Sequence, residues 1–175
     1  MKVAFIASMQ SGKTTALEYF IQLNTLYKRK SICIKFANPL YEAQYCFLPN
    51  GTKNRLFLQE LSDLVKKHFG PEILNQKFIE KDNKNKIDVF CDDVRTSSEF
   101  EIVKQQGFLT IGIMASENIR KVRNPQLFID INHITEIEIN NLLPLCDYLI
   151  QNESSKESFF KQCMKIYQEN FQPQT

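Results

Sequence analysis

The chain has 175 residues, 43% of them hydrophobic and 24% charged, with a formal net charge of +2. These are ordinary values for a globular protein, and so small a charge gives no indication of a nucleic-acid partner or an acidic membrane surface. No apolar run approaches membrane-spanning length, and the five cysteines lie scattered without a C-x-x-C pair, so we expect reduced thiols in a cytoplasmic, reducing compartment.

Strand-like and helix-like segments alternate along the chain. Short apolar runs predict β-strands at residues 3–6, 31–36, 87–91, 108–114 and 148–150. Apolar spacing and cap signals predict helices after Gly12 and at residues 38–47, 52–69, 71–79, 97–106, 136–143 and 154–171. This alternation predicts one α/β domain over residues 1–175, with a five-stranded parallel sheet covered by helices on both faces.

Three local expectations accompany this order of elements. In the helix at 52–69, the side chains expected to face the core are Leu56, Leu61, Leu64 and Val65. Residues 81–86 are polar and charged, so we expect a loop there. The segment 116–125 is polar and basic, and we expect it to be mobile.

The stretch AFIASMQSGKTTA, residues 4–16, joins the first strand to the first helix. It matches the phosphate-binding pattern G-x-x-x-x-G-K-[ST], except that Ala7 stands where the pattern begins with Gly. In such a loop, backbone N–H groups surround a polyphosphate, Lys13 reaches its terminal phosphates, and the Thr14 hydroxyl contacts Mg²⁺. Alanine is tolerated if its φ is negative. The sequence therefore predicts a P-loop that binds ATP through Gln10, Ser11, Gly12, Lys13, Thr14 and Thr15.

A second motif follows the third predicted strand. Residues 87–93 form an apolar run that ends in Asp92 and Asp93, as in a Walker B element. A carboxylate at this position holds Mg²⁺ against the phosphates, directly or through water. We expect the metal near Thr14, Asp92 and Asp93, and the sequence leaves open which aspartate is nearer.

Four arginines lie on segments expected near the nucleotide. Arg55 opens a helix face with Gln59 four residues later, and Arg95, Arg120 and Arg123 follow the ends of strands. Several arginines offset the repulsion between two anions and stabilise charge on a transferring phosphoryl group. A phosphate acceptor needs no strong base, because its oxygens are already ionised near neutral pH. The set therefore favours phosphoryl transfer from ATP to a small molecule that already carries a phosphate.

Two other nucleotide-binding classes fit less well. Asn85-Lys86-Ile87-Asp88 matches the N-K-x-D box that reads guanine, but it precedes the third strand, and no D-x-x-G switch element follows. An ATPase motor is disfavoured because the chain is short and has no evident sensor helix domain. The sequence leaves a monomer and a homodimer both open.

Several short motifs resemble those of the phage-type deoxynucleoside monophosphate kinases. FANPLY at residues 36–41 resembles F-A-D-P-L-K, and RLFLQEL at 55–61 resembles R-x-L-L-Q-x-L. DVRTSSEFE at 93–101 resembles D-V-R-F-x-N-E-A-E, while HITE at 133–136 and DYLIQN at 147–152 resemble H-x-S-E and F-D-x-x-I-x-N. The resemblance implies a P-loop NTPase fold and transfer of the ATP γ-phosphoryl group to a (deoxy)nucleoside 5′-monophosphate.

The resemblance also implies roles for individual residues. Acceptor-binding helices at about 38–79 and the loop after the third strand would bind the substrate through Asn38, Arg55, Gln59, Asp93 and Arg95. A short lid at about 116–125 would complete a catalytic set of Lys13, Arg95, Arg120 and Arg123. The chain departs from the family pattern at Asn38 and Tyr41, and from the usual P-loop at Ala7. These departures leave open a kinase for another phosphorylated small molecule, such as phosphomevalonate or dephospho-coenzyme A, and a catalytically inactive nucleotide-binding module.

Overall fold

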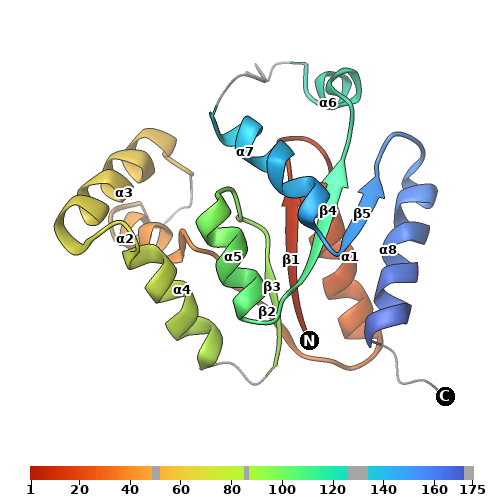
Figure 1. Ribbon diagram of the computed structural model, residues 1–175, viewed down its shortest axis with the longest axis horizontal. Coiled ribbons are helices and arrows are strands. Elements are labelled where there is room, and N and C mark those ends of the chain that lie inside the picture. The colour runs from red at the N-terminus through yellow and green to blue at the C-terminus, as the bar shows by residue number, and fades with distance from the viewer. Residues whose placement is uncertain (49–51, 85–86, 126–133, 172–175) are drawn as a thin grey trace.

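The computed structural model describes residues 1–48, 52–84, 87–125 and 134–171 (Figure 1). Its sheet has five parallel strands in the order β2-β3-β1-β4-β5. Their bounds are β1 Lys2–Ala7, β2 Ser31–Cys33, β3 Asp88–Cys91, β4 Leu109–Met114 and β5 Tyr148–Gln151. Because the strands are parallel, their carboxyl ends share one edge, which is where open α/β sheets bind ligands.

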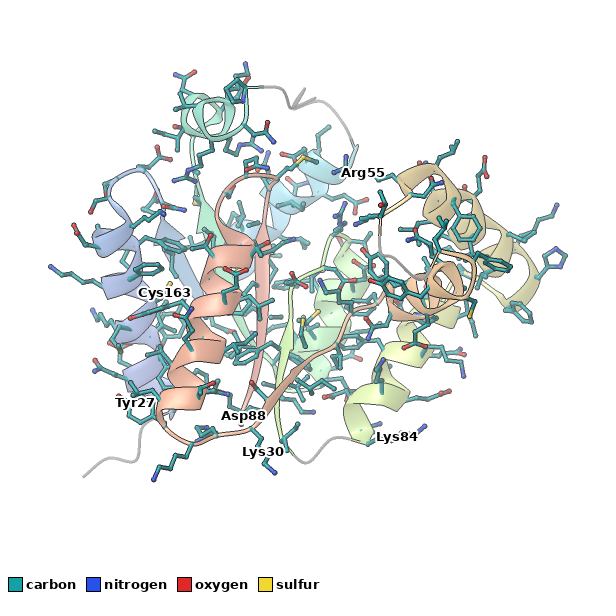
Figure 2. All side chains as sticks on the ribbon, turned by 180° about the vertical axis from the view of Figure 1, so that it is seen from behind. Tyr27, Lys30, Arg55, Lys84, Asp88 and Cys163 are labelled. Atoms are coloured by element: carbon teal, nitrogen blue, oxygen red, sulfur yellow. The ribbon has the colours of Figure 1, made fainter. Side chains whose placement is uncertain are left out.

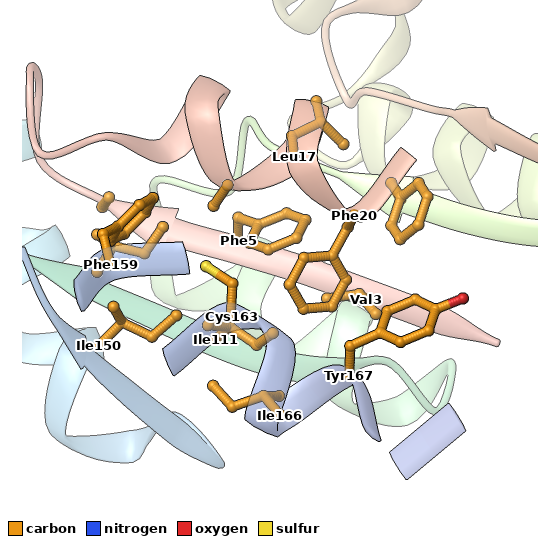
Figure 3. Packing of buried hydrophobic residues seen from close by; sticks show 14 of the residues in the cluster. Val3, Phe5, Leu17, Phe20, Ile111, Ile150, Phe159, Cys163, Ile166 and Tyr167 are labelled. Atoms are coloured by element: carbon orange, nitrogen blue, oxygen red, sulfur yellow. The ribbon is translucent and has the colours of Figure 1, made fainter. Parts of the chain in front are cut away.

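Helices cover both faces of this sheet, as the sequence predicts. One face carries α1 (Lys13–Leu26) and α8 (Lys156–Phe171), and the other carries α4 (Ile73–Asn83), α5 (Ser97–Gln105) and α7 (Ile134–Leu142). Successive β1 side chains point to opposite faces, so Phe5 packs toward α1 and α8 while Ile6 packs toward α5 and α7. Figure 3 shows Phe5, Phe20 and Tyr167 within the first of these two cores.

A smaller group of helices lies beside the sheet (Figure 1). Helices α2 (Asn38–Phe47), α3 (Arg55–Phe69) and α4 share a separate apolar cluster built around Leu40, Leu58 and Leu74. Leu56 and Leu64 are 67% and 53% exposed, so the prediction that they face the core was wrong. The helix instead turns the stripe of Leu58, Leu61 and Val65 toward α2 and α4.

Several element boundaries differ from the sequence-based expectation, and the ends of β2 and α4 are two examples. The second strand ends at Cys33, whereas the sequence predicted an end at Phe36. The N–H groups of Phe36 and Ala37 instead donate to the Asp93 carboxylate, so the chain turns away from the sheet there. Helix α4 continues to Asn83, so it includes half of the expected loop at 81–86.

The segment 116–125 contains a short helix, α6 (Glu117–Arg123). The Ser116 backbone N–H and hydroxyl both donate to Glu153, which anchors the start of this helix beyond β5. Asn85 and Lys86 of the N-K-x-D match, and His133, lie outside the described residues. Within the described ranges, every helix is too short or too polar to span a lipid bilayer.

Candidate active site

The phosphate loop joins β1 to α1 at the carboxyl edge of the sheet. Ser11 N donates to Ser8 O at 3.2 Å, and Gln10 and Gly12 have positive φ angles of 64° and 103°. Positive φ angles within a tight turn direct neighbouring N–H groups into a shared concavity, which is the geometry of an anion-binding nest. Ala7 is the last residue of β1, and its φ is not in the positive region, so it replaces the usual glycine without strain.

Asn152, which follows β5, braces this loop from the side. Its Nδ2 donates to Ser11 O at 2.8 Å, and a Cβ added to Gly12 would lie 2.3 Å from that nitrogen. Gly12 is therefore required both by its φ angle and by the close approach of Asn152. Sequence reasoning assigned no role to Asn152, since a contact between residues 141 positions apart leaves no local pattern.

A cavity of about 570 Å³, the loop cavity, opens over the phosphate loop. The expected ATP-binding residues that line it are Gln10, Gly12, Lys13, Thr14 and Thr15. Burial lowers the pKa of Lys13 and the Arg95 charge lowers it further, while Asp92 and Asp93 act in the opposite direction. A bound polyphosphate would relieve this cost, because its charge stabilises the ammonium form. Ser11 is buried and lines a smaller cavity behind the loop instead.

The two arginines of α6 have different partners. Arg123 donates from Nη1 to Gln10 O at 3.1 Å and from Nη2 to Asn152 O at 2.8 Å, so it lies over the loop and lines the loop cavity. Arg120 is only 6% exposed, and its Nη1 pairs with Glu136 Oε2 at 2.7 Å. The Arg120 guanidinium is therefore held by a carboxylate, whereas Arg123 binds carbonyl oxygens at the rim of the cavity.

A second cavity of about 510 Å³, the helical cavity, lies between α2, α3 and the end of β3. Its apolar lining comes mainly from Phe36, Leu40, Leu58 and Leu74, and its polar lining includes Tyr41, Lys53, Arg55, Gln59 and Lys66. In Figure 2, Arg55 lies in the upper part of the view, whereas Asp88 lies near the bottom. Asn38 opens α2, but the described residues that line the two cavities do not include it.

Among the described residues, the two cavities share Met9, Arg95 and Glu136. The backbone before α5 is fixed by a capping box, in which Glu99 Oε2 accepts from Arg95 N at 2.7 Å and from Thr96 N at 3.1 Å. This cap holds the Arg95 main chain while its side chain borders both cavities. Ligands in the two cavities would therefore both lie beside the Arg95 guanidinium.

The two aspartates after β3 are engaged by protein groups. Asp93 accepts from Phe36 N at 3.1 Å and from Ala37 N at 3.0 Å, using one carboxylate oxygen for each. Burial raises the pKa of Asp93, although these two hydrogen bonds lower it. Asp92 pairs with Lys35 Nζ at 2.8 Å and lines neither cavity.

The loop cavity offers few protein groups that could ligate a divalent cation directly. Thr14 lies on the wall of the loop cavity, and within the described ranges no three His, Cys, Asp or Glu side chains group as a metal site. The oxygen donors present suit Mg²⁺ held by Thr14 and by the phosphates of a nucleotide. Asp92 and Asp93 are both already paired with protein groups, so we do not expect either of them to be a direct ligand of the metal.

Comparison with known proteins identifies the fold. No protein-family model and no curated protein matches the sequence. Shikimate kinase from Aquifex aeolicus aligns over 98% of this chain and 99% of its own, with a TM-score of 0.59 and 12% identity. Shikimate kinase from Bacteroides thetaiotaomicron aligns over 97% of both chains, with a TM-score of 0.56 and 10% identity. Dephospho-CoA kinase from Campylobacter jejuni also aligns over 97% of both chains, with a TM-score of 0.45 and 21% identity. The chain therefore shares the three-layer α/β fold of these two shikimate kinase structures, which confirms the predicted fold class.

Proposed function

We propose that the chain is a nucleoside monophosphate kinase, which transfers the γ-phosphoryl group of ATP to a (deoxy)nucleoside 5′-monophosphate. The observation that carries this proposal is the pair of adjoining cavities that share Arg95. Each is of a size that holds a nucleotide-scale ligand. Cations line both, with Lys13 and Arg123 on the loop cavity and Arg55 and Lys66 on the helical cavity. Such a site accommodates two anions side by side.

The transfer step needs little from the protein besides position and charge. ATP would occupy the loop cavity, with Mg²⁺ neutralising its phosphates when bound. An ionised oxygen of the acceptor phosphate attacks the γ-phosphorus, the bond to the β–γ bridging oxygen breaks, and ADP leaves with that electron pair. Lys13, Arg95 and Arg123 stabilise the charge that spreads over the transferring group.

The acids of the helical cavity favour a phosphate acceptor over an alcohol. An alcohol benefits from a general base, but Asp93, Glu99 and Glu136 are each hydrogen-bonded to backbone N–H groups. A phosphate is already ionised and needs no such base. The apolar lining around Leu40 and Leu58 suits the planar base of a nucleoside, and Arg55 suits its phosphate.

The remaining expectations fit this proposal. All five cysteines are free thiols, which supports a cytoplasmic, reducing compartment. The partners we propose are small-molecule nucleotides, with no role for nucleic acid or a membrane, and a homodimer is compatible with the site. The proposed acceptor-binding residues are Arg55, Gln59 and Arg95. Asn38 and Asp93 would act indirectly, by shaping the start of α2 and the segment that leads into it.

A substrate screen tests the proposal. Purified protein is incubated with ATP and Mg²⁺ and one acceptor at a time, and ADP formation is compared with chromatographic yield of the new diphosphate. The acceptors are the deoxynucleoside and nucleoside monophosphates, phosphomevalonate and dephospho-coenzyme A. We expect transfer to monophosphates, its loss in Lys13→Met, and no change in Lys165→Met, which removes an exposed cation on α8.

Two outcomes would overturn the assignment in different ways. Transfer only to phosphomevalonate would keep a phosphate as the acceptor group and change the substrate, whereas transfer only to dephospho-coenzyme A, which accepts on a hydroxyl, would also overturn the preference for a phosphate acceptor. Binding of ATP without transfer to any acceptor would identify a nucleotide-binding module that lacks activity.

A further inference from the structure

A buried ion pair between α6 and α7 is hydrogen-bonded to Met9 of the phosphate loop. Arg120 Nη1 and Glu136 Oε2 lie 2.7 Å apart, and their side chains are 8% and 11% exposed. Met9 N donates to Glu136 Oε1 at 3.2 Å, and Arg120 Nη1 also donates to Met9 O at 3.3 Å. The pair therefore holds both the N–H and the carbonyl group of Met9.

Protein stability alone does not explain why this ion pair is buried. Taking two charges out of water is costly, and an apolar pair of similar size often serves a fold as well. The Arg120 Nε is buried and has no hydrogen-bond partner among the described residues, so the guanidinium is not even fully satisfied. A buried charge pair kept in this form, in contact with a ligand-binding loop, is better explained by a role at the site.

The position of the pair indicates what that role is. Glu136 and Met9 border both the loop cavity and the helical cavity, whereas Arg120 lines neither and faces a cavity of about 280 Å³ behind the loop. Arg123, three residues along the same helix, does line the loop cavity. The two arginines of α6 are thus placed for different tasks.

We propose that Glu136 and Arg120 are positioning residues that together fix Met9 between the two substrates, and that Arg120 makes no contact with the phosphates. This inference rests on the proposed phosphoryl transfer. Met9 borders both cavities, so its displacement changes the approach of the two phosphates more than the binding of either one. Glu136→Gln and Arg120→Met should each lower kcat about 10- to 100-fold and change the KM for ATP less than about threefold.

A double-mutant cycle in kcat distinguishes an indirect role of Arg120 from a direct one. If Arg120 and Glu136 act as one unit that holds Met9, the variant carrying both Arg120→Met and Glu136→Gln should be no slower than the slower single variant. Arg123→Met combined with Glu136→Gln should instead multiply the two losses. The exposed pair Lys165 and Glu169 on α8, changed to Met and Gln, is the matched control for charge removal.

A second readout does not depend on catalysis. The Met9 amide is held by Glu136, so its hydrogen exchange, followed by NMR, should accelerate at least about tenfold in either single variant and no further in the double variant. Multiplicative kcat losses for Arg120 and Glu136, or a lowered melting temperature with kcat and Met9 exchange unchanged, would overturn the inference. If no acceptor is phosphorylated, the proposed function fails, but the exchange experiment still tests the grip on Met9.

Discussion

Replacing Asp93 with asparagine separates a structural role of this residue from a metal-binding role. Asparagine has the same shape but only one acceptor oxygen, so the N–H of either Phe36 or Ala37 would face an amide group. A hydrogen bond to a charged acceptor contributes about 1.5–3 kcal/mol, and an unsatisfied buried donor costs about 1–3 kcal/mol. The lost hydrogen bond and the unsatisfied donor are partly the same effect, so their costs do not add in full. We expect the free energy of unfolding to fall by about 3 kcal/mol.

The effect on activity should be confined to the acceptor. Phe36 and Ala37 line the helical cavity at the approach to α2, so loosening them should raise the acceptor KM about tenfold, equivalent to about 1.4 kcal/mol. The affinity for ATP and the Mg²⁺ requirement should change less than about threefold. Urea unfolding, calorimetry with an ATP analogue and steady-state kinetics measure these quantities. Asp63→Asn, at an exposed position of α3, is the matched control. Unchanged stability together with a Mg²⁺ requirement raised tenfold or more would show that Asp93 is a metal ligand and refute this reasoning.

Three further predictions concern other parts of the chain. Gly12→Ala forces a φ of 103° on alanine and drives its Cβ against Asn152, so the free energy of unfolding should fall by about 2–3 kcal/mol, and ATP binding measured by calorimetry should be lost. Arg95→Met should lower acceptor kcat/KM about 10³-fold with less than a tenfold loss of ATP affinity. Equal losses would count against its proposed role at the acceptor. Burial opposes the charge of Asp88, but Arg29 at 2.6 and 2.9 Å and the N-terminal ammonium hold its pKa below the ordinary value. Asp88→Asn should therefore lower the free energy of unfolding by about 3 kcal/mol at neutral pH. This difference should shrink as pH falls below about 4 through the depressed pKa, as measured by urea unfolding at each pH. A stability difference that does not depend on pH would contradict a role for the ion pair.

The sequence predicted the features that depend on local pattern. Each strand of the sheet was found, because apolar runs bounded by turn residues are typical of buried parallel strands. The placement of Lys13, Thr14 and Arg95 around one cavity followed from the rule that parallel strands present their carboxyl ends at one edge. These residues could be located without coordinates, because their position relative to a strand is enough.

The features that were missed depend on contacts between distant segments. Leucines fall on two faces of α3, so spacing alone could not select the face of Leu58 over that of Leu56 and Leu64. Helix α6 is too short for its propensity to reveal it, and it is stabilised by contacts such as that of Ser116 with Glu153.

Glu136 and Asn152 contact the phosphate loop across 127 and 141 residues of sequence, and no spacing rule connects such positions. The different environments of Arg120 and Arg123 likewise came only from the structure, since both are basic residues of one polar segment.

Simultaneous binding of two anionic substrates in adjoining cavities beside Arg95 is what sets this site apart from a simple ATP-binding site. A bisubstrate analogue, in which a polyphosphate bridge joins adenosine to a deoxynucleoside, measures this most directly by isothermal titration calorimetry. We expect one analogue to bind per chain, at least about 100-fold more tightly than ATP, and most of that advantage to be lost in Arg95→Met. An affinity equal to that of ATP, or an advantage that Arg95→Met leaves intact, would contradict this expectation.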